Sequence, residues 1–269
     1  MKLPSNTEVR RARPLLGTIV DIACAGSSAD VDRAFCTVEQ VQRLMSFHDR
    51  ASDISRINRD GFRQRVIVHP WTWRVLKTAQ ELSHQSEDAF DITVASKVHG
   101  AGWRDIVLEK NRAVRLQRRV LIDLGGIAKG FAVDRAVDAL HRDGVTRGIV
   151  NAGGDIRVFG PTARAVHLRH PSSPVLPAGV LRVANRAIAT SATYFAPRAL
   201  IDARTRRPLI DFVSVTVAAD NCMIADALTK IVFTLRERSA PLLKHYHANA
   251  LLLERDGSAS WMAQCDTRD

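Results

Sequence analysis

Apolar residues recur at a spacing of three or four positions in four stretches of the chain. Residues spaced in this way lie on one face of a helix, so each stretch predicts an amphipathic helix packed against a core. The four stretches are residues 31–45, 71–82, 133–140 and 223–235. Gly144 is placed to end the third of these helices.

Short apolar or alternating runs between the helices predict strands. The predicted strands are residues 18–22, 89–94, 119–122, 148–152, 166–168, 179–181, 187–191, 213–217 and 250–253. A hairpin is expected between residues 102 and 118, with its turn near Lys110 and Asn111. Residues 46–58 carry many small polar side chains, which predicts a binding loop or a plain surface loop. Because strands and helices alternate without strict β-α-β order, we expect an α+β fold with mixed sheets and packed helices.

The length of 269 residues and the 46% share of hydrophobic residues allow a substantial core. We expect residues 1–269 to form a single unit, and two closely packed subdomains within it are the alternative. No apolar run approaches the roughly 18 residues that span a bilayer, so we expect no transmembrane segment. Residues 1–8 lack the apolar core of a signal peptide. We therefore expect a cytoplasmic location for the chain as written, and a periplasmic one if a leader has been removed.

Cysteine spacing and net charge narrow the classes of function. Cys24, Cys36, Cys222 and Cys265 show no Cys-x-x-Cys spacing, which argues against a zinc site and a disulfide scaffold. The net charge of +11 suits a nucleic acid, an acidic membrane or an anionic small molecule as a partner. The sequence contains no RNA-recognition aromatics, helix-turn-helix or zinc finger, so we expect no specific nucleic-acid binding.

Residues 123–134 carry the strongest candidate for chemistry. Gly125 and Gly126 lie where the predicted strand at 119–122 turns into a helix. Glycines let backbone groups approach a ligand, and the helix N-terminus favours a phosphate. Lys129 adds a full positive charge there. A phosphate site and a tight turn with an exposed lysine are both consistent with this stretch.

Further ligand-type groups lie at the ends of predicted strands and on the last predicted helix. They are Asp91, Asp123, Asp155, Thr190, Ser191, Asp226, Thr229 and Lys230. Because positions i and i+3 share a helix face, Asp226 and Thr229 can offer oxygens to a hard cation such as Mg²⁺. The alternative is a surface salt bridge between Asp226 and Lys230, worth only about 0.3–0.5 kcal/mol. Composition and spacing therefore predict a phosphate-bearing ligand and leave metal assistance open.

Taken in order along the chain, these motifs resemble those of the ApbE family of flavin transferases. The matching segments are residues 16–18, 45–46, 52–58, 89–94, 122–134, 151–155, 189–191, 214–217 and 225–228. Family members transfer FMN from FAD to a threonine or serine of a target flavoprotein. The resemblance implies an ApbE-like fold, FAD as substrate with Mg²⁺ at its pyrophosphate, and AMP as the leaving group.

The resemblance also assigns individual residues. The implied FAD-binding residues are Leu16, His48, Ala89, Phe90, Asp91, Asp123, Lys129, Thr190, Ser191 and Ile201. The implied metal ligands are the carbonyl of Gly126 with Asp226 and Thr229. Asp123, Lys129 and Asp226 are the implied catalytic residues. A metal and a lysine can neutralise the charge that develops on the phosphates while the substrate hydroxyl attacks.

Three positions depart from the family pattern. Ala199 stands where members often carry a histidine that is a candidate base, His48 replaces a usual tyrosine, and Lys230 replaces a metal-site threonine. The leading hypothesis is Mg²⁺-assisted FMN transfer, with Mg²⁺ dependence weakened but retained. Ala199 and Lys230 favour a second hypothesis, a relative that binds FAD or hydrolyses its pyrophosphate without modifying a protein. A basic nucleic-acid-binding protein is the third.

Overall fold

The largest element of the computed structural model is an eight-stranded sheet, and the model describes residues 8–170, 173–192, 200–209 and 214–263. In sheet order the strands are β1 (Val9–Leu15), β2 (Thr18–Cys24), β6 (Gly148–Ala152), β7 (Asp155–Phe159), β10 (Ala187–Ala192), β11 (Ser214–Ala219), β12 (Asn249–Leu253) and β13 (Ala259–Met262). Every neighbouring pair in this sheet is antiparallel.

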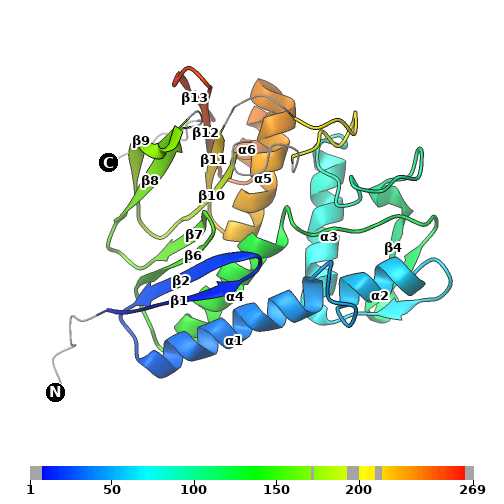
Figure 1. The fold of residues 1–269 in the computed structure, drawn as a ribbon, viewed down its shortest axis with the longest axis horizontal. Helices are drawn as coiled ribbons and strands as arrows, with labels where there is room; N and C mark the ends of the chain where they lie inside the picture. The colour runs from blue at the N-terminus through cyan, green and yellow to red at the C-terminus, as the bar shows by residue number, and fades with distance from the viewer. Residues whose placement is uncertain (1–7, 171–172, 193–199, 210–213, 264–269) are drawn as a thin grey trace.

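Three helices cover one face of this sheet (Figure 1). They are α1 (Ser28–Met45), α4 (Ala128–Arg142) and α5 (Cys222–Leu235), and α4 packs between the other two. The hairpin of β8 (Arg164–His170) and β9 (Ser173–Val183) packs Val166 and Val183 against Ile156 and Ile188 of the sheet. The central strands are therefore covered by apolar side chains on both faces.

A smaller group of elements lies to the right of the sheet in Figure 1. It consists of α2 (Asp53–Asp60), α3 (Pro70–Gln85) and a three-stranded antiparallel sheet of β3 (Val66–Ile67), β5 (Ala113–Leu116) and β4 (Ile106–Glu109). Short helices complete the fold: η1 (Trp103–Asp105), η2 (Lys110–Arg112), η3 (Arg236–Ser239) and α6 (Ala240–His245). One continuous cluster of buried apolar side chains runs through both groups. That residues 1–269 form a single unit stays a prediction.

The α+β class is confirmed, and so are the four predicted helices, which correspond to α1, α3, α4 and α5. The hairpin at 102–118 is confirmed as β4 and β5, and its turn contains Asn111 with a φ of 58°. Gly144 follows the cap of α4 with a φ of 80°, as expected of a residue that ends a helix. The sheets that we expected to be mixed are antiparallel in every pairing among the described residues.

The prediction of a strand at residues 119–122 is wrong. This segment belongs to no strand, and the backbone groups of Leu121 and Ile122 bond to side chains instead of to a neighbouring strand. The side chain of Asn58 accepts from the amide of Ile122 at 2.8 Å and donates to its carbonyl at 2.9 Å. The Ser96 hydroxyl accepts from the amide of Leu121 at 2.7 Å. The apolar run predicts that this segment is buried. It is not a strand, because the backbone hydrogen bonds of Leu121 and Ile122 go to side chains and not to another strand.

Two other local predictions are corrected. Residues 89–94 form turns and no strand, because the Asp91 carboxylate accepts from both the amide and the hydroxyl of Thr93 at 2.7 Å. The second half of the predicted loop at 46–58 is helix α2, whose N-cap Ser52 accepts from the amide of Ser55. This short helix has few apolar residues among many polar ones, so its sequence shows no clear helical pattern.

Four strands were not predicted from the sequence: β1, β3, β7 and β13. β3 has only two residues, and β7 begins directly after the glycine pair that follows the predicted strand at 148–152. β1 is rich in arginine and β13 is mostly exposed, so neither has the apolar pattern of a buried strand. The other strand predictions correspond to β2, β6, β8, β9, β10, β11 and β12. Val213, at the start of one predicted strand, lies outside the described residues, as does Cys265.

Candidate functional site

The first turns of α4 and α5 touch at Gly130. A Cβ atom added to Gly130 would lie 2.2 Å from the carbonyl oxygen of Cys222 and 2.9 Å from Cβ of Asp226. The amide of Gly130 donates to Oδ2 of Asp226 at 3.2 Å. Only a residue without a side chain allows this approach, which brings the start of α4 against a buried carboxylate of α5.

Asp134 on α4 fixes the direction of α5. Its two carboxylate oxygens accept from the amides of Cys222 and Met223, each at 2.9 Å. These amides belong to the first turn of α5, where backbone donors have no partner within the helix. Burial raises the pKa of Asp134, although the two amides and Arg157 act in the opposite direction. A side chain of one helix therefore caps the next and sets the geometry of the site.

Two lysines and two aspartates form a buried charge cluster between these helices and β7. The ammonium of Lys129 forms an ion pair with Asp155 and lies 3.7 Å from Oδ2 of Asp226. The ammonium of Lys230 contacts Oδ1 of Asp226 and lies 3.0 Å from the Asp226 carbonyl. The side chain of Asp226 is fully buried, so its pairing with Lys230 is no surface salt bridge.

Burial and the neighbouring charges shift the pKa values of this cluster. Burial raises the pKa of Asp155, and the charge of Asp226 helps to bring it to about 6. Burial alone would also raise the pKa of Asp226, but Lys129 and Lys230 lower it. Burial alone would lower the pKa of Lys129, but the carboxylates of Asp226 and Asp155 raise it. Lys129 and Asp226 are therefore charged at neutral pH.

The cluster faces a cavity of about 410 Å³. The predicted site residues that line it are Ala89, Phe90, Asp91, Asp123, Gly126, Lys129, Thr190, Ser191 and Ile201. Asp226 and Thr229 lie fully buried behind this lining, and the Thr229 hydroxyl is 2.7 Å from that of Ser191. The structure thus brings together residues that are far apart in the sequence. Asp123 sits at the glycine turn, where its carboxylate accepts from the amide of Gly125 at 2.8 Å.

Leu16 and His48 are not among the residues that line this cavity. Leu16 lies in the turn between β1 and β2 with a φ of 57°, and its amide donates to the side chain of Gln42. His48 is exposed and packs edge-on against Phe47. Their assignment to the flavin site stays a prediction. Ala199, the position of the family histidine, lies outside the described residues.

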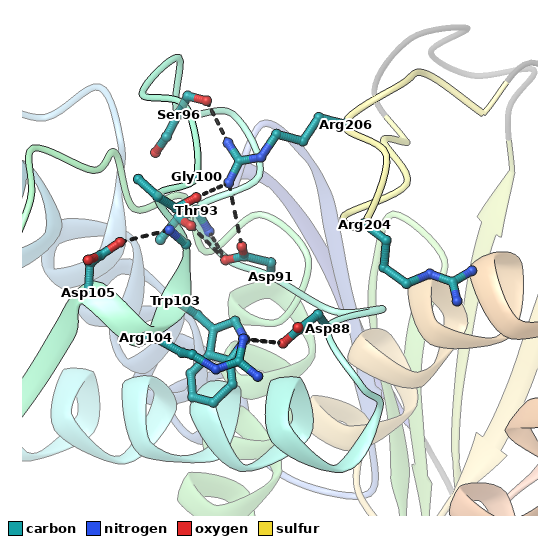
Figure 2. A network of polar contacts seen from close by, with 12 residues as sticks. Asp88, Asp91, Thr93, Ser96, Gly100, Trp103, Arg104, Asp105, Arg204 and Arg206 are labelled. Carbon is teal, nitrogen blue, oxygen red and sulfur yellow. Dashed lines mark hydrogen bonds and ion pairs between the residues drawn. The ribbon is translucent and has the colours of Figure 1, made fainter.

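Arg206 holds a segment that lines the cavity, although its own side chain is not among the lining residues. Its guanidinium donates to the carbonyl of Ser96 at 2.6 Å and to that of Ala101, and it lies 3.9 Å from Oδ2 of Asp91 (Figure 2). These contacts fasten the segment at 200–209, which contributes four lining residues: Leu200, Ile201, Ala203 and Leu209. In the sequence, Arg206 is one of several arginines in a basic run, and nothing there distinguishes it.

Asp91 contacts both Thr93 and Arg206 beside the cavity. Burial raises its pKa, while its bonds to Thr93 and the charge of Arg206 act in the opposite direction. Neighbouring polar side chains are paired as well: Trp103 donates to Asp88 at 2.7 Å (Figure 2). Arg118 donates to Asp105 at 2.8 Å. The network beside the cavity therefore holds loops together.

The residues implied to hold Mg²⁺ do not fit a divalent cation in this arrangement. One oxygen of Asp226 contacts the ammonium of Lys230, and the other accepts from Gly130 with Lys129 nearby. The Thr229 hydroxyl donates to the carbonyl of Asp226 at 2.7 Å. Among the described residues, no group of three or more histidine, cysteine or acidic side chains is placed to hold a metal. Both carboxylate oxygens of Asp226, the only charged ligand in the implied set, are therefore already engaged by ammonium groups and a backbone donor.

The fold and the site define a class of protein. A glycine turn at the N-terminus of α4, with two ammonium groups beside it, suits the phosphates of a ligand. The apolar side chains of Phe90, Ile201 and Phe233 line the same cavity and suit an organic ring system. The site is therefore that of a protein that binds a phosphate-bearing aromatic ligand.

Comparison with known proteins identifies the family. The model of the ApbE family matches residues 16–100 and 97–252, and the chain belongs to this family. The FAD:protein FMN transferase of Vibrio cholerae is 28% identical over 246 residues, which cover 77% of this chain and 73% of that protein. The FAD:protein FMN transferase of Klebsiella pneumoniae is 25% identical over 236 residues, covering 76% and 74% respectively.

Solved structures share the fold. The ApbE protein of Thermotoga maritima matches with a TM-score of 0.85 at 24% identity, covering 94% of this chain and 96% of that one. The flavin transferase ApbE of Vibrio cholerae matches with a TM-score of 0.80 at 24% identity, covering 95% and 96%. The expected ApbE-like fold is therefore confirmed. Within the described part of the chain, no helix has the length and apolar character needed to cross a membrane.

Proposed function

We propose that this chain transfers FMN from FAD to a threonine or serine hydroxyl of a target protein. Its membership of the ApbE family and its similarity to several FAD:protein FMN transferases support this proposal. The observation that carries it is the pair of ammonium groups, Lys129 and Lys230, on the wall of a cavity that also presents aromatic and glycine residues.

The proposed reaction is a phosphoryl-group substitution. The substrate hydroxyl attacks the phosphorus of the FMN half of FAD, and a phosphoester bond forms between the hydroxyl oxygen and that phosphorus. The bond between this phosphorus and the bridging oxygen breaks, and AMP leaves with the bonding electrons. The hydroxyl proton passes to a carboxylate, a role that we assign to Asp123 because it lines the cavity beside the glycine turn.

The lysines stabilise the charge of this reaction. Negative charge increases on the leaving phosphate as the bond breaks, and fixed ammonium groups in a buried site stabilise it strongly. Asp155 and Asp226 hold Lys129 and Lys230 in place, so the site is arranged before the substrate enters. The Mg²⁺ that the resemblance implies has no part in these steps, since its ligands do not fit.

A second candidate is FAD binding or pyrophosphate hydrolysis without modification of a protein. Ala199 at the histidine position, which cannot move a proton, and Lys230 at the metal position favour it. The test is mass spectrometry of a threonine-bearing flavoprotein after incubation with this chain and FAD. A mass increase of one FMN group, with release of AMP, is expected. Release of AMP with an unmodified acceptor would favour the second candidate.

Lys129→Ala tests the placement of FAD in this cavity. Loss of a charge-assisted contact should weaken FAD binding by about 1.5–3 kcal/mol, as measured by calorimetry. Lys77→Ala is the matched control, because Lys77 is exposed on α3 and pairs only loosely with Glu81 at 3.8 Å. An unchanged affinity in Lys129→Ala, with a folded protein by circular dichroism, contradicts the placement.

A further inference from the structure

Lys230 occupies the space between the buried carboxylate of Asp226 and the glycine turn. Its ammonium contacts Oδ1 of Asp226 and lies 3.0 Å from the Asp226 carbonyl one helical turn earlier. A Cβ atom added to Gly126 would lie 3.5 Å from Cε of Lys230. The side chain of Lys230 is 21% exposed and lines the cavity. The Lys230 ammonium therefore lies beside Asp226, one of the implied metal ligands, and a ligand in the cavity can contact the Lys230 side chain.

The charges of the cluster balance without a metal. Lys129 and Lys230 carry two positive charges, and Asp155 and Asp226 carry two negative charges when ionised. A divalent cation at Asp226 would lie within contact distance of the Lys230 ammonium, in a buried site where like charges repel strongly. The cation would have to displace Lys230 from the carboxylate before it could bind.

The hydroxyl of Thr229 offers no replacement ligand. It donates to the carbonyl of Asp226, its neighbour within 2.7 Å is the hydroxyl of Ser191, and the side chain is fully buried. It is held inside the protein, behind the cavity wall, while Lys230 reaches the wall itself. The position on α5 that faces the ligand therefore carries a positive charge instead of an oxygen.

We propose that the Lys230 ammonium acts as the second cation for the pyrophosphate of FAD, so that this chain binds FAD without a divalent metal. This inference rests on the proposed function, since it assumes FAD as the ligand. Two contacts of the Lys230 ammonium go to Asp226, which leaves one of its three donors for the pyrophosphate, next to the ammonium of Lys129. Asp226 holds Lys230 by its carboxylate and so positions the ammonium.

Calorimetry of FAD binding in EDTA and in Mg²⁺ tests the inference. The native chain should bind FAD with the same affinity in both, within about twofold. Lys230→Met keeps the apolar stem but removes the charge, so FAD binding should weaken at least about tenfold in both conditions. Lys230→Thr supplies an oxygen, so its weakened binding in EDTA should be recovered in Mg²⁺.

Two controls separate loss of charge from loss of structure. Lys77→Thr removes a lysine that is likewise four residues from an acidic partner but does not line the cavity, and it should leave FAD binding unchanged. Lys230→Arg keeps the positive charge and should bind FAD in EDTA. Thermal unfolding of each variant confirms that it is folded, and Lys230→Arg provides the test if the other variants do not fold.

The outcomes distinguish this inference from the proposed function. If the native chain binds FAD only in Mg²⁺, the inference is wrong and the proposed function stands. Undiminished binding of FAD by Lys230→Met in EDTA also overturns the inference alone. If the native chain binds no FAD in either condition, the proposed function fails and the inference fails with it.

Discussion

Arg206 has a backbone conformation that residues with a side chain rarely adopt. Its φ of 57° lies in the left-handed region, which glycine tolerates best. Such strain costs on the order of 1 kcal/mol and persists where surrounding contacts offset it. The guanidinium makes those contacts with Ser96, Ala101 and Asp91. We infer that Arg206 positions the segment at 200–209 as a wall of the cavity.

Substitutions at Arg206 separate its contacts from its backbone strain. Arg206→Ala and Arg206→Gly both remove the guanidinium, so both should weaken FAD binding, as measured by calorimetry. Arg206→Gly also relieves the strain, so its free energy of unfolding should exceed that of Arg206→Ala by about 1 kcal/mol. Thermal unfolding should accordingly occur at a higher temperature in Arg206→Gly. Arg204→Ala is the control, because among the described residues the Arg204 guanidinium makes only long contacts, at 3.9 Å to Asp202 and 3.5 Å to Thr234. An FAD affinity of Arg206→Ala equal to that of the native chain would contradict the inference that Arg206 positions the segment at 200–209.

Asp155 should make FAD binding depend on pH. Its pKa is raised to about 6 in the ligand-free chain by burial and by Asp226. The pyrophosphate of FAD brings further negative charge to Lys129 and should raise this pKa again, so binding takes up a proton. FAD affinity should therefore rise as pH falls through neutrality and level off below about 6. Each further unit of pKa corresponds to about a tenfold change in affinity.

The variant Asp155→Asn tests this linkage, because an amide does not titrate between pH 5 and 8. Its FAD affinity, measured by calorimetry across that range, should be nearly constant. Lys129 keeps Asp226 as a partner in this variant, at 3.7 Å. A pH dependence that survives in Asp155→Asn would assign it to another group.

The contact between α4 and α5 is the element-scale feature on which the site depends. Gly130 lets the two helices approach, and Asp134 caps α5 from α4. The same contact places Lys129 next to Asp226 and lets the Gly130 amide donate to that carboxylate. Packing between two helices thus determines the electrostatics of the cavity.

Gly130→Ala should therefore affect both stability and ligand binding. Its Cβ would meet the backbone carbonyl of Cys222 at 2.2 Å, which cannot move aside as a side chain can. Overpacking of this kind costs about 1–3 kcal/mol, measurable by denaturant unfolding, and FAD binding should weaken as Lys129 moves from Asp226. Gly179→Ala is the matched control, since nothing lies within 4 Å of its added Cβ. Equal stability of the two variants would contradict the close helix contact.

At the scale of the whole molecule, many basic side chains pair with acidic ones on the surface. Arg11 contacts Asp32 and Arg33 contacts Asp143, both at 2.9 Å. Exposed pairs of this kind add little stability, but the net charge of +11 leaves a positive field around the molecule. That field attracts anions in general, including FAD.

Nucleic-acid binding should accordingly be weak and independent of sequence. Binding through phosphate charges alone releases counterions, so the affinity for DNA should fall by orders of magnitude between about 50 and 200 mM salt. Fluorescence anisotropy with two duplexes of unrelated sequence measures this, and both should respond alike. Tight binding to one duplex that persists at about 200 mM salt would support the nucleic-acid hypothesis instead.

The sequence by itself determined the elements whose pattern is local. Apolar periodicity located α1, α3, α4 and α5, because one face of each is buried and the other is not. Motifs in a fixed order indicated the ApbE family, and nine of the residues that they singled out line one cavity. Both results depend on information carried by neighbouring positions or by residue identity.

Tertiary structure alone decided which groups meet. The apolar run at 119–122 is no strand because Asn58 and Ser96, distant in sequence, bond to its backbone. Lys230 could not be told from a surface lysine until α5 packed against α4 and buried Asp226 beside it. Contacts between remote segments decide whether a charged side chain is buried and which partners it has. These contacts therefore set the free-energy cost of burying the charge and the strength of its interactions. The periodicity of a chain reports which face is buried, but not which charges that burial brings together.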